Sequence, residues 1–302
     1  MIVNSKSKSK LKQPRITELT KKHINDYKAK VELNGGYLPM RTARQFSSVG
    51  RATSEHLSKL EQRHEYFSDL EKNFGLVLGF MDNVHAVKTQ FPLLNIKKTL
   101  KVATHLNIMH PRYEPRGQVA DHNAGFQAAV ITTDFLIDVV DKDTGELKSV
   151  AISIKYDDAF EASDGNERVV ARTKSKLAIE QFYWQKVNGV RFLIITDSFW
   201  ALDPTLLKNL GTARIHRDIQ IPPILEHSLL CHFHETLDFS NSSRRRLVDV
   251  IDTLHVQTGY KIERLYSFFW YFVWKKKLKV DLFKPIADGG YVFQGEALTW
   301  KV

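Results

Sequence analysis

Three residues that could carry out chemistry lie between positions 71 and 155 of the 302-residue chain: Glu71, Asp134 and Lys155. Asp134 opens one apolar run and Lys155 closes another, and the polar stretch 141–146 lies between the two runs. This stretch has a glycine near its end, so the pattern predicts a β-hairpin. Such a hairpin would carry an acid and a lysine on adjacent strands.

This combination of side chains is suited to metal-dependent cleavage of a phosphodiester bond. A hard divalent cation binds carboxylate and carbonyl oxygens, and it clamps a phosphate while it activates a water molecule. A nearby lysine stabilises the negative charge of the reacting phosphate or positions the water. Glu71 would add a second acid from a helix that begins near Ser68. Spacing alone is weak support, because acids and lysines about twenty residues apart also occur by accident.

The composition predicts a globular protein with a polyanionic partner. Hydrophobic residues make up 43% of the chain, and its length suggests two domains. The formal net charge is +10. Part of this charge is clustered, which favours nucleic acid as the partner over a diffuse charge that only serves solubility. The candidate DNA-binding residues are Arg51, Arg244, Arg245, Lys275, Lys276 and Lys277.

Single features argue against several other classes of protein. The one cysteine, Cys231, allows no intramolecular disulfide and excludes a cysteine-rich zinc finger. The N-terminus is rich in serine and lysine and lacks the apolar core of a signal peptide. The longest apolar run, 265–274, is too short to cross a bilayer. We therefore expect a cytoplasmic protein with no membrane association.

The order of the expected elements predicts an α/β nuclease core. Residues 1–14 predict a flexible basic arm, and a helix that contains Glu71 runs to about residue 82. After the hairpin, residues 172–188 predict an amphipathic helix that ends at Gly189, and a buried strand follows. Helix, strand, hairpin, helix and strand in this order match the core of restriction-endonuclease-like nucleases, a mixed sheet flanked by helices.

Six short segments within residues 36–200 carry a resemblance to a known family. They are residues 67–71, 90–94, 132–138, 151–155, 180–186 and 192–197. Taken in this order, they resemble the TnsA family, the endonuclease subunit of heteromeric bacterial transposases. The resemblance is far more specific than the spacing of the acids.

The resemblance implies a magnesium-binding nuclease domain over residues 15–200, with manganese as a candidate substitute metal. Glu71, Asp134 and Lys155 match the catalytic residues of the family. The implied metal ligands are the two carboxylates and the backbone carbonyl of Ile154. Each residue also has a non-catalytic interpretation. Glu71 could be an acid on the helix surface that faces water, Asp134 a residue at a strand edge, and Lys155 a solvated lysine at a strand end.

A fourth acid and two departures from the family pattern bear on the same site. Glu180 matches an acid on the following helix and is a further candidate metal ligand, although it could instead only pair with Lys176. Ser153 stands where the family has glutamine and many related nucleases have an acid. Serine is a poor metal ligand, so metal binding would depend on the other oxygens. Tyr156 stands where proline is expected, which affects only the local shape of the backbone.

Residues 201–302 predict a small winged-helix-like C-terminal domain. Residues 243–257 and 261–277 predict two helices, and residues 279–283 and 291–293 predict the two strands of a β-wing. The resemblance to the TnsA family implies the same kind of domain. Its basic surface could bind DNA, or the domain could dock a protein partner.

The resemblance implies a DNA endonuclease that cleaves the 5′ ends of a transposon during cut-and-paste transposition. The implied partners are transposon-end DNA, a TnsB-like DDE-type transposase that cuts and joins the 3′ ends, and a TnsC-like ATPase regulator. One alternative is a stand-alone restriction or junction-resolving nuclease. Another is a non-catalytic DNA-binding scaffold of a transposition complex.

Overall fold

The computed structural model of the chain falls into two compact units. It describes residues 11–45, 51–57, 62–113, 126–163, 165–239 and 245–301. Unit 1 consists of Met1–Glu71 and His85–Asp197, and unit 2 consists of Lys72–Val84 and Ser198–Val302. The chain passes between the units at residues 71–72, 84–85 and 197–198, and the third of these junctions lies near residue 200, where a boundary was expected. The grouping of residues 72–84 with the C-terminal part is new. Residues 1–10 of the predicted basic arm lie outside the described residues.

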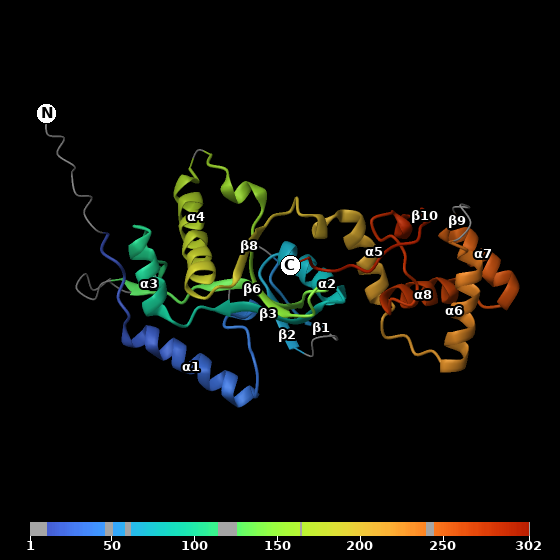
Figure 1. The fold of residues 1–302 in the computed structure, drawn as a ribbon, viewed down its shortest axis with the longest axis horizontal. Coiled ribbons are helices and arrows are strands. Elements are labelled where there is room, and N and C mark those ends of the chain that lie inside the picture. Colours follow the sequence, from blue (N-terminus) through green and yellow to red (C-terminus); the bar gives the residue numbers. More distant parts are fainter. Residues whose placement is uncertain are drawn as a thin grey trace. The chain divides into compact units, whose positions relative to one another are not determined.

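A four-stranded mixed sheet in the order β3-β6-β7-β8 forms the centre of unit 1 (Figure 1). Its strands are β3 (Val84–Pro92), β6 (Thr132–Val140), β7 (Leu147–Ile154) and β8 (Arg191–Ile195). β6 and β7 are antiparallel, with Ile137 opposite Val150, so the predicted hairpin is present. β7 and β8 are parallel, with Ile154 opposite Ile195. The mixed sheet flanked by helices is thus confirmed.

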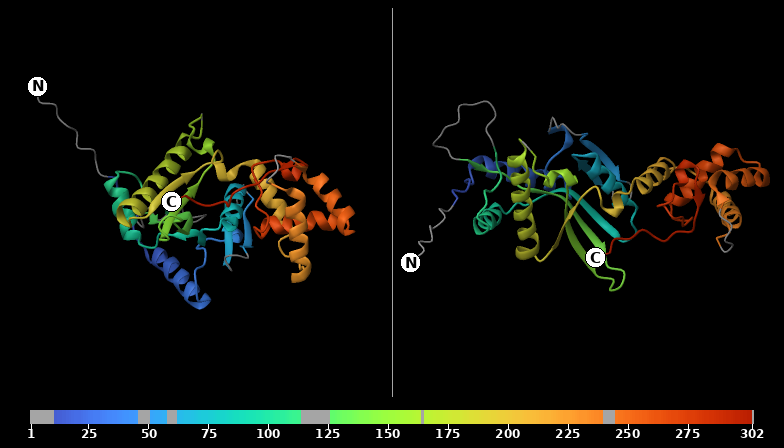
Figure 2. Two further views of the ribbon diagram at one scale, coloured as in Figure 1. Left: turned by 45° about the vertical axis from the view of Figure 1, so that its right-hand side comes forward. Right: turned by 90° about the horizontal axis from the view of Figure 1, so that it is seen from above.

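Helices α3 (Ile96–His105) and α4 (Glu167–Phe182) lie side by side and cover the sheet (Figures 1 and 2). Their buried side chains, among them Val102 and Leu177, form one apolar cluster with Leu136 of β6 and Ala151 of β7. Burial of this apolar surface is the main stabilising contribution to the unit. α4 continues as a turn of π-helix, Tyr183–Val187, close to its predicted end.

The remaining elements of unit 1 are short except for the first helix. They are α1 (Glu18–Asn34), the 3₁₀ turns Ala43–Gln45 and Asp157–Phe160, the β1 (Thr53–Leu57) and β2 (Gln62–Tyr66) pair, and the β4 (Arg112–Tyr113) and β5 (Gln127–Ala128) pair. α1 begins at a capping box, in which Thr17 and Thr20 each bond the other's backbone N–H. Helix α2 (Asp69–Phe80) carries Glu71 in its first turn, as predicted, and the rest of the helix belongs to unit 2.

Unit 2 is built mainly from helices around an aromatic core. Its main helices are α5 (Pro204–Ile215), α6 (Pro223–Leu237), α7 (Leu247–Thr258) and α8 (Ile262–Trp274). Seven of the thirteen residues of α8 are buried, and Phe268, Phe269, Trp270 and Phe272 are at most 1% exposed. The apolar run 265–274 is therefore a core helix of unit 2. None of the described helices has the length and apolar character needed to cross a membrane.

The strand pairing in unit 2 differs from the predicted wing. β9 (Arg245–Arg246) pairs with β10 (Tyr291–Val292). The two predicted wing segments are linked by a short antiparallel bridge, in which Val280 lies opposite Gln294 and the Asp281 N–H donates to the Phe293 carbonyl at 2.9 Å. Because residues 245 and 246 are extended, α7 begins at Leu247 and not at residue 243. Between the two wing segments the chain folds tightly after Pro285: the Gly290 N–H donates to the Pro285 carbonyl at 3.0 Å, and a Cβ on Gly290 would lie 2.6 Å from that oxygen.

Candidate active site

Asp134, Ile154 and Lys155 meet at the end of the β6–β7 pair where β6 begins and β7 ends. Lys155 Nζ donates to Asp134 Oδ2 at 2.8 Å and to the Ile154 carbonyl at 2.6 Å. The backbone N–H of Ile154 donates to the same Asp134 oxygen at 2.8 Å. Asp134 is only 5% exposed, so this contact is shielded from water. The hairpin register thus brings together the predicted aspartate, lysine and carbonyl.

Glu71 is a buried residue held by hydrogen bonds with three residues, Ser68, Phe67 and Gln90. Its backbone N–H is capped by Ser68 Oγ at 3.1 Å, as expected for a helix that begins at a serine. Its Oε2 accepts from the backbone N–H of Phe67 at 3.0 Å and from Gln90 Nε2 at 3.2 Å. The residue is 7% exposed, so it is not a water-facing acid on the helix surface.

The two carboxylates affect each other's charge. Burial and the neighbouring Asp134 carboxylate raise the pKa of Glu71 to about 8, against the hydrogen bond from Phe67 and the charge of Lys155. Burial alone would raise the pKa of Asp134, but the charge and hydrogen bond of Lys155 lower it below its ordinary value. Burial opposes the charge of Lys155, whose pKa is nevertheless raised by Asp134. Asp134 and Lys155 therefore form an ion pair, and the raised pKa of Glu71 favours its protonated form at neutral pH, whereas a nearby cation would favour the ionised form.

Glu180 sits beside this group in a network of its own. Its Oε2 accepts from Thr133 Oγ1 at 2.9 Å and from Ser153 Oγ at 3.2 Å. Its Oε1 lies 3.2 Å from Lys176 Nζ, so the pairing one helical turn away is present. Trp184 Nε1 in turn donates to Thr133 Oγ1 at 2.8 Å. Ser153, the departure from the family pattern, is thus a donor to Glu180, while metal binding by Glu180 stays a prediction.

Gln90 is a site residue that the sequence did not single out. It lies on β3, is 2% exposed and has a φ of 53°, a left-handed conformation that is uncommon for a residue with a side chain. Its side chain donates to Glu71 and accepts from Thr132 Oγ1 at 3.3 Å. Backbone strain of this kind persists where the surrounding structure requires it. The residue type and its position in a strand gave no signal of this conformation.

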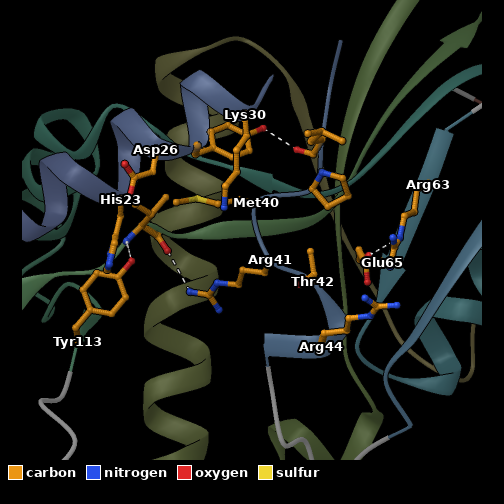
Figure 3. Close-up of a pocket in the computed structure, with 14 residues that line it drawn as sticks. His23, Asp26, Lys30, Met40, Arg41, Thr42, Arg44, Arg63, Glu65 and Tyr113 are labelled. Carbon is orange, nitrogen blue, oxygen red and sulfur yellow. Dashed lines mark hydrogen bonds and ion pairs between the residues drawn. The ribbon is translucent and has the colours of Figure 1, made fainter. Parts of the chain in front are cut away.

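Arg41 is a second residue that was missed. Its guanidinium donates to the Val130 carbonyl at 3.2 Å, and it points into a hollow of unit 1 (Figure 3). Burial lowers the pKa of Arg41, whereas the charges of Asp134 and Glu180 oppose this shift. The arginine is therefore close enough to the buried acids to interact with them. In the sequence it stands in a segment without hydrophobic periodicity.

The oxygen donors of the site fit a hard divalent cation. Among the residues that the structure describes, no three or more His, Cys, Asp and Glu side chains group as a metal site. The predicted ligand set needs fewer: the carboxylates of Glu71 and Asp134 and the Ile154 carbonyl, which are oxygen donors of the kind that magnesium prefers. The raised pKa of Glu71 is consistent with a position where added positive charge is favourable.

The predicted DNA-binding residues are divided between the two units. Arg51 is an exposed residue of unit 1, and Arg245 is an exposed residue of β9 in unit 2. Arg244 lies outside the described residues. The two predicted arginines that the structure describes, Arg51 and Arg245, therefore belong to different units.

The lysine cluster after α8 is partly occupied by ion pairs within unit 2. Lys276 pairs with Asp82, and Lys277 Nζ lies 2.7 Å from Glu226 Oε1. Lys275 is exposed, and its ammonium lies 5.6 Å from the centre of the Tyr271 ring. Of the three predicted lysines, Lys275 is thus the one that forms no direct ion pair with a described residue, although its charge helps to lower the pKa of Glu226.

Comparison with known proteins finds a family match that covers most of the candidate active site. Residues 81–197 match the family described as TnsA-like endonuclease N terminal. The chain is also 29% identical over 174 residues to the transposition protein TnsA of transposon Tn7 from Escherichia coli. This match covers 58% of the chain and 54% of the relative, so the chain spans about half the length of that relative. The resemblance to the TnsA family is confirmed; Asp134, Lys155 and Glu180 lie within residues 81–197, and Glu71 precedes them.

Proposed function

We propose that this TnsA-like chain is a magnesium-dependent DNA endonuclease that cleaves the 5′ ends of a transposon during cut-and-paste transposition. The observation that carries the proposal is the meeting of Asp134, Lys155 and the Ile154 carbonyl at the end of the hairpin, with buried Glu71 interacting electrostatically with Asp134. A buried acid pair with one lysine is costly for stability alone, and such costs are typical of functional sites.

Each residue then has a distinct task. A magnesium ion held by Glu71, Asp134 and the Ile154 carbonyl would polarise the scissile phosphate and make an attacking water more acidic. Asp134 keeps Lys155 charged and fixes its ammonium. That ammonium stabilises negative charge on the phosphate or orients the water. Gln90 and the N–H of Phe67 hold the Glu71 carboxylate in place.

The proposed partners are transposon-end DNA, a TnsB-like DDE-type transposase and a TnsC-like ATPase, and the proposed location is the cytoplasm. The similar protein TnsA of transposon Tn7 is a transposition protein, which supports a role in a transposition complex. In this division of labour the transposase recognises the transposon ends and cuts the 3′ ends. The nuclease then needs no sequence-reading element of its own.

The C-terminal unit is proposed to be a winged-helix-like domain. Its support is the order of α6, β9, α7 and α8 followed by a strand that returns to pair with β9. Because most of α8 is buried, only the ends of that helix are available for DNA. Arg245 and Lys275 are the best placed of the predicted contacts, since Lys276 and Lys277 already pair with carboxylates.

The function is tested by cleavage of donor DNA in magnesium, by the chain alone and with TnsB-like and TnsC-like proteins. We expect nicks at the 5′ ends only when the partners are present, with manganese able to replace magnesium and a chelator abolishing the nicks. Efficient cleavage by the chain alone would identify a stand-alone nuclease. A complete absence of 5′ nicks in the full mixture, with 3′ cuts present, would identify a non-catalytic scaffold.

A further inference from the structure

A hollow of about 550 Å³ opens in unit 1 between α1, the segment that leads to the first 3₁₀ turn, and β2 (Figure 3). Four basic side chains line it, whereas only two carboxylates do. The basic residues are Lys30, Arg41, Arg44 and Arg63, and the acids are Asp26 and Glu65. The lining therefore favours an anion.

Buried Glu65 organises the basic end of the hollow. It is 1% exposed, and its Oε2 accepts from the backbone N–H of Ala43 at 2.8 Å. Its Oε1 accepts from Ser54 Oγ at 3.1 Å and lies 3.0 Å from Arg63 Nε. Glu65 thus fixes the backbone just before Arg44 and the guanidinium of Arg63. Figure 3 shows the two arginines on either side of Glu65.

Glu65 does not neutralise both arginines. Its contacts reach Arg63, whereas Arg44 is exposed and makes no hydrogen bond or ion pair with any residue that the structure describes. The same two arginines also line a second hollow, beside Ser54 of β1. Arg63 is held in place by Glu65, and Arg44 has no carboxylate partner among the described residues. A guanidinium of this kind suits a phosphate group, which it binds through two parallel N–H donors.

Arg41 links the hollow to the candidate active site. It lines the hollow, and its guanidinium donates to the Val130 carbonyl, two residues before β6 begins. It also interacts electrostatically with Asp134 and Glu180. A chain of phosphates that runs through the hollow would therefore come near the buried carboxylates.

We propose that this hollow holds the sugar–phosphate backbone of the DNA strand next to the scissile phosphate, with Arg44 and Arg63 contacting phosphates. The proposal rests on the proposed nuclease function, and it adds a substrate-binding surface on unit 1, whereas Arg245 and Lys275 belong to unit 2. Contacts to phosphates position DNA without reading its sequence. Such a contact agrees with a nuclease whose cleavage sites are chosen by a partner.

The test is the binding of a short fluorescent DNA duplex by the full chain, in a chelator and over a range of salt concentrations. We expect Arg44→Gln to weaken binding severalfold for any sequence and to reduce the slope of log affinity against log salt by about 1. Arg44→Lys should keep most of that slope. Arg44→Gln is expected to fold normally, because Arg44 is exposed and makes no hydrogen bond or ion pair with any residue that the structure describes.

The matched control is Arg191→Gln. Arg191 is also exposed, but it does not line the hollow; it stands at the start of β8 opposite Val150, five residues before Lys155. It should bind DNA like the wild type, with the same salt slope. An Arg44→Gln protein that matches the wild type in affinity and slope would overturn the proposal, and so would an equal loss in both variants.

Two further results separate this inference from others. If a deoxynucleoside monophosphate displaces the duplex at low concentration, and only when Arg44 is present, the hollow is a nucleotide site and the strand-binding proposal is wrong. If Arg44→Gln weakens DNA binding while loss of Asp134 leaves nicking unchanged, the binding surface stands and the proposed active site fails.

Discussion

The two units bury very different side chains. Among the described residues, the four buried carboxylates, Glu65, Glu71, Asp134 and Glu180, all belong to unit 1. Unit 2 buries a set of aromatic rings on α8, together with Phe233 of α6. The buried polar residues of unit 2 are neutral: Asn83, Asn209 and Thr236. Unit 1 thus carries the free-energy cost of buried carboxylates, whereas unit 2 has an apolar core with neutral buried polar residues.

This contrast separates stability from chemistry. Buried acids cost free energy unless donors and cations compensate them, whereas buried aromatic rings contribute stability directly. Each of the four acids in unit 1 accepts hydrogen bonds from named donors, and three of them come near a lysine or arginine at 3.2 Å or less. We therefore expect substitutions in unit 2 to change stability and substitutions around Asp134 to change catalysis.

The largest expected effect is on the core of unit 2. Trp270 is completely buried, so Trp270→Ala should lower the free energy of unfolding by about 3–5 kcal/mol. Urea unfolding followed by circular dichroism measures this loss. Val256→Ala on α7 is the control, because Val256 is 84% exposed and its truncation should change stability by less than about 0.5 kcal/mol. Equal effects of the two substitutions would contradict the aromatic-core description.

A second variant at the same position sharpens this test. The buried indole N–H of Trp270 has no hydrogen-bond partner among the described residues. Trp270→Phe should therefore cost clearly less than Trp270→Ala, since it removes no hydrogen bond. Nicking by Trp270→Phe should match that of the wild type at a temperature where both are folded.

Next in size is the effect of removing the lysine of the site. Lys155→Met should lower the rate of 5′ nicking by about 10²–10³-fold, because a charge that stabilises the reacting phosphate is lost. Single-turnover nicking in the reconstituted system measures this rate. Lys148→Met is the control on the same strand, since Lys148 pairs with Asp141 at 2.6 Å near the hairpin turn. A similar loss in both variants would argue against a special role of Lys155.

A smaller, pH-dependent effect is expected at Glu71. Its pKa is about 8 in the folded chain and 4.5 ordinarily, so between these values the folded state keeps a proton that the unfolded state has released. The free energy of unfolding should therefore fall as the pH rises from about 5 to about 8, by up to about 1.4 kcal/mol per pH unit. Below that window the contribution is fully present.

Urea unfolding of wild type and Glu71→Gln at several pH values, without metal, isolates this contribution. The difference between the two proteins should change across the window, and magnesium should reduce the change in the wild type because it stabilises the ionised carboxylate. Curves that stay parallel from pH 5 to pH 8 would show that Glu71 does not titrate there.

The smallest effect is expected at the lysines after α8. Lys277→Gln removes a partly exposed ion pair with Glu226 and should cost less than about 1 kcal/mol. DNA titrations over a range of salt should show a larger effect of Lys275→Gln than of Lys277→Gln, since Lys277 is already paired. The reverse order would mean that DNA displaces the Glu226 contact.

The sequence predicted the parts of the site that depend on local pattern. Asp134 and Lys155 stand at the ends of two apolar runs, and the hairpin register alone is enough to bring them together. Glu71 follows a serine cap, so its helix could also be expected. The resemblance to the TnsA family then selected these three residues from the many acids and lysines of the chain.

The missed residues depend on contacts between distant parts of the chain. Gln90 reaches Glu71 from another strand in an uncommon backbone conformation, and Arg41 approaches the acids from a segment without periodicity. The partner of β10 was missed for a similar reason, because β10 pairs with Arg245–Arg246, which lies before both helices of that region. The pairing of Lys276 with Asp82, far away in the sequence, also has no local signal.

The central claim is that Asp134 belongs to the active site for 5′ cleavage, and strand-specific mapping of donor-DNA cuts tests it most directly. Asp134→Ala is compared with Asp138→Asn, which changes an acid of the same strand that bonds to Lys88 and Ser149. Each is assayed in magnesium with TnsB-like and TnsC-like partners. The account predicts that Asp134→Ala loses the 5′ nicks and keeps the 3′ cuts, while Asp138→Asn keeps both. Unchanged 5′ nicking by Asp134→Ala would contradict the account.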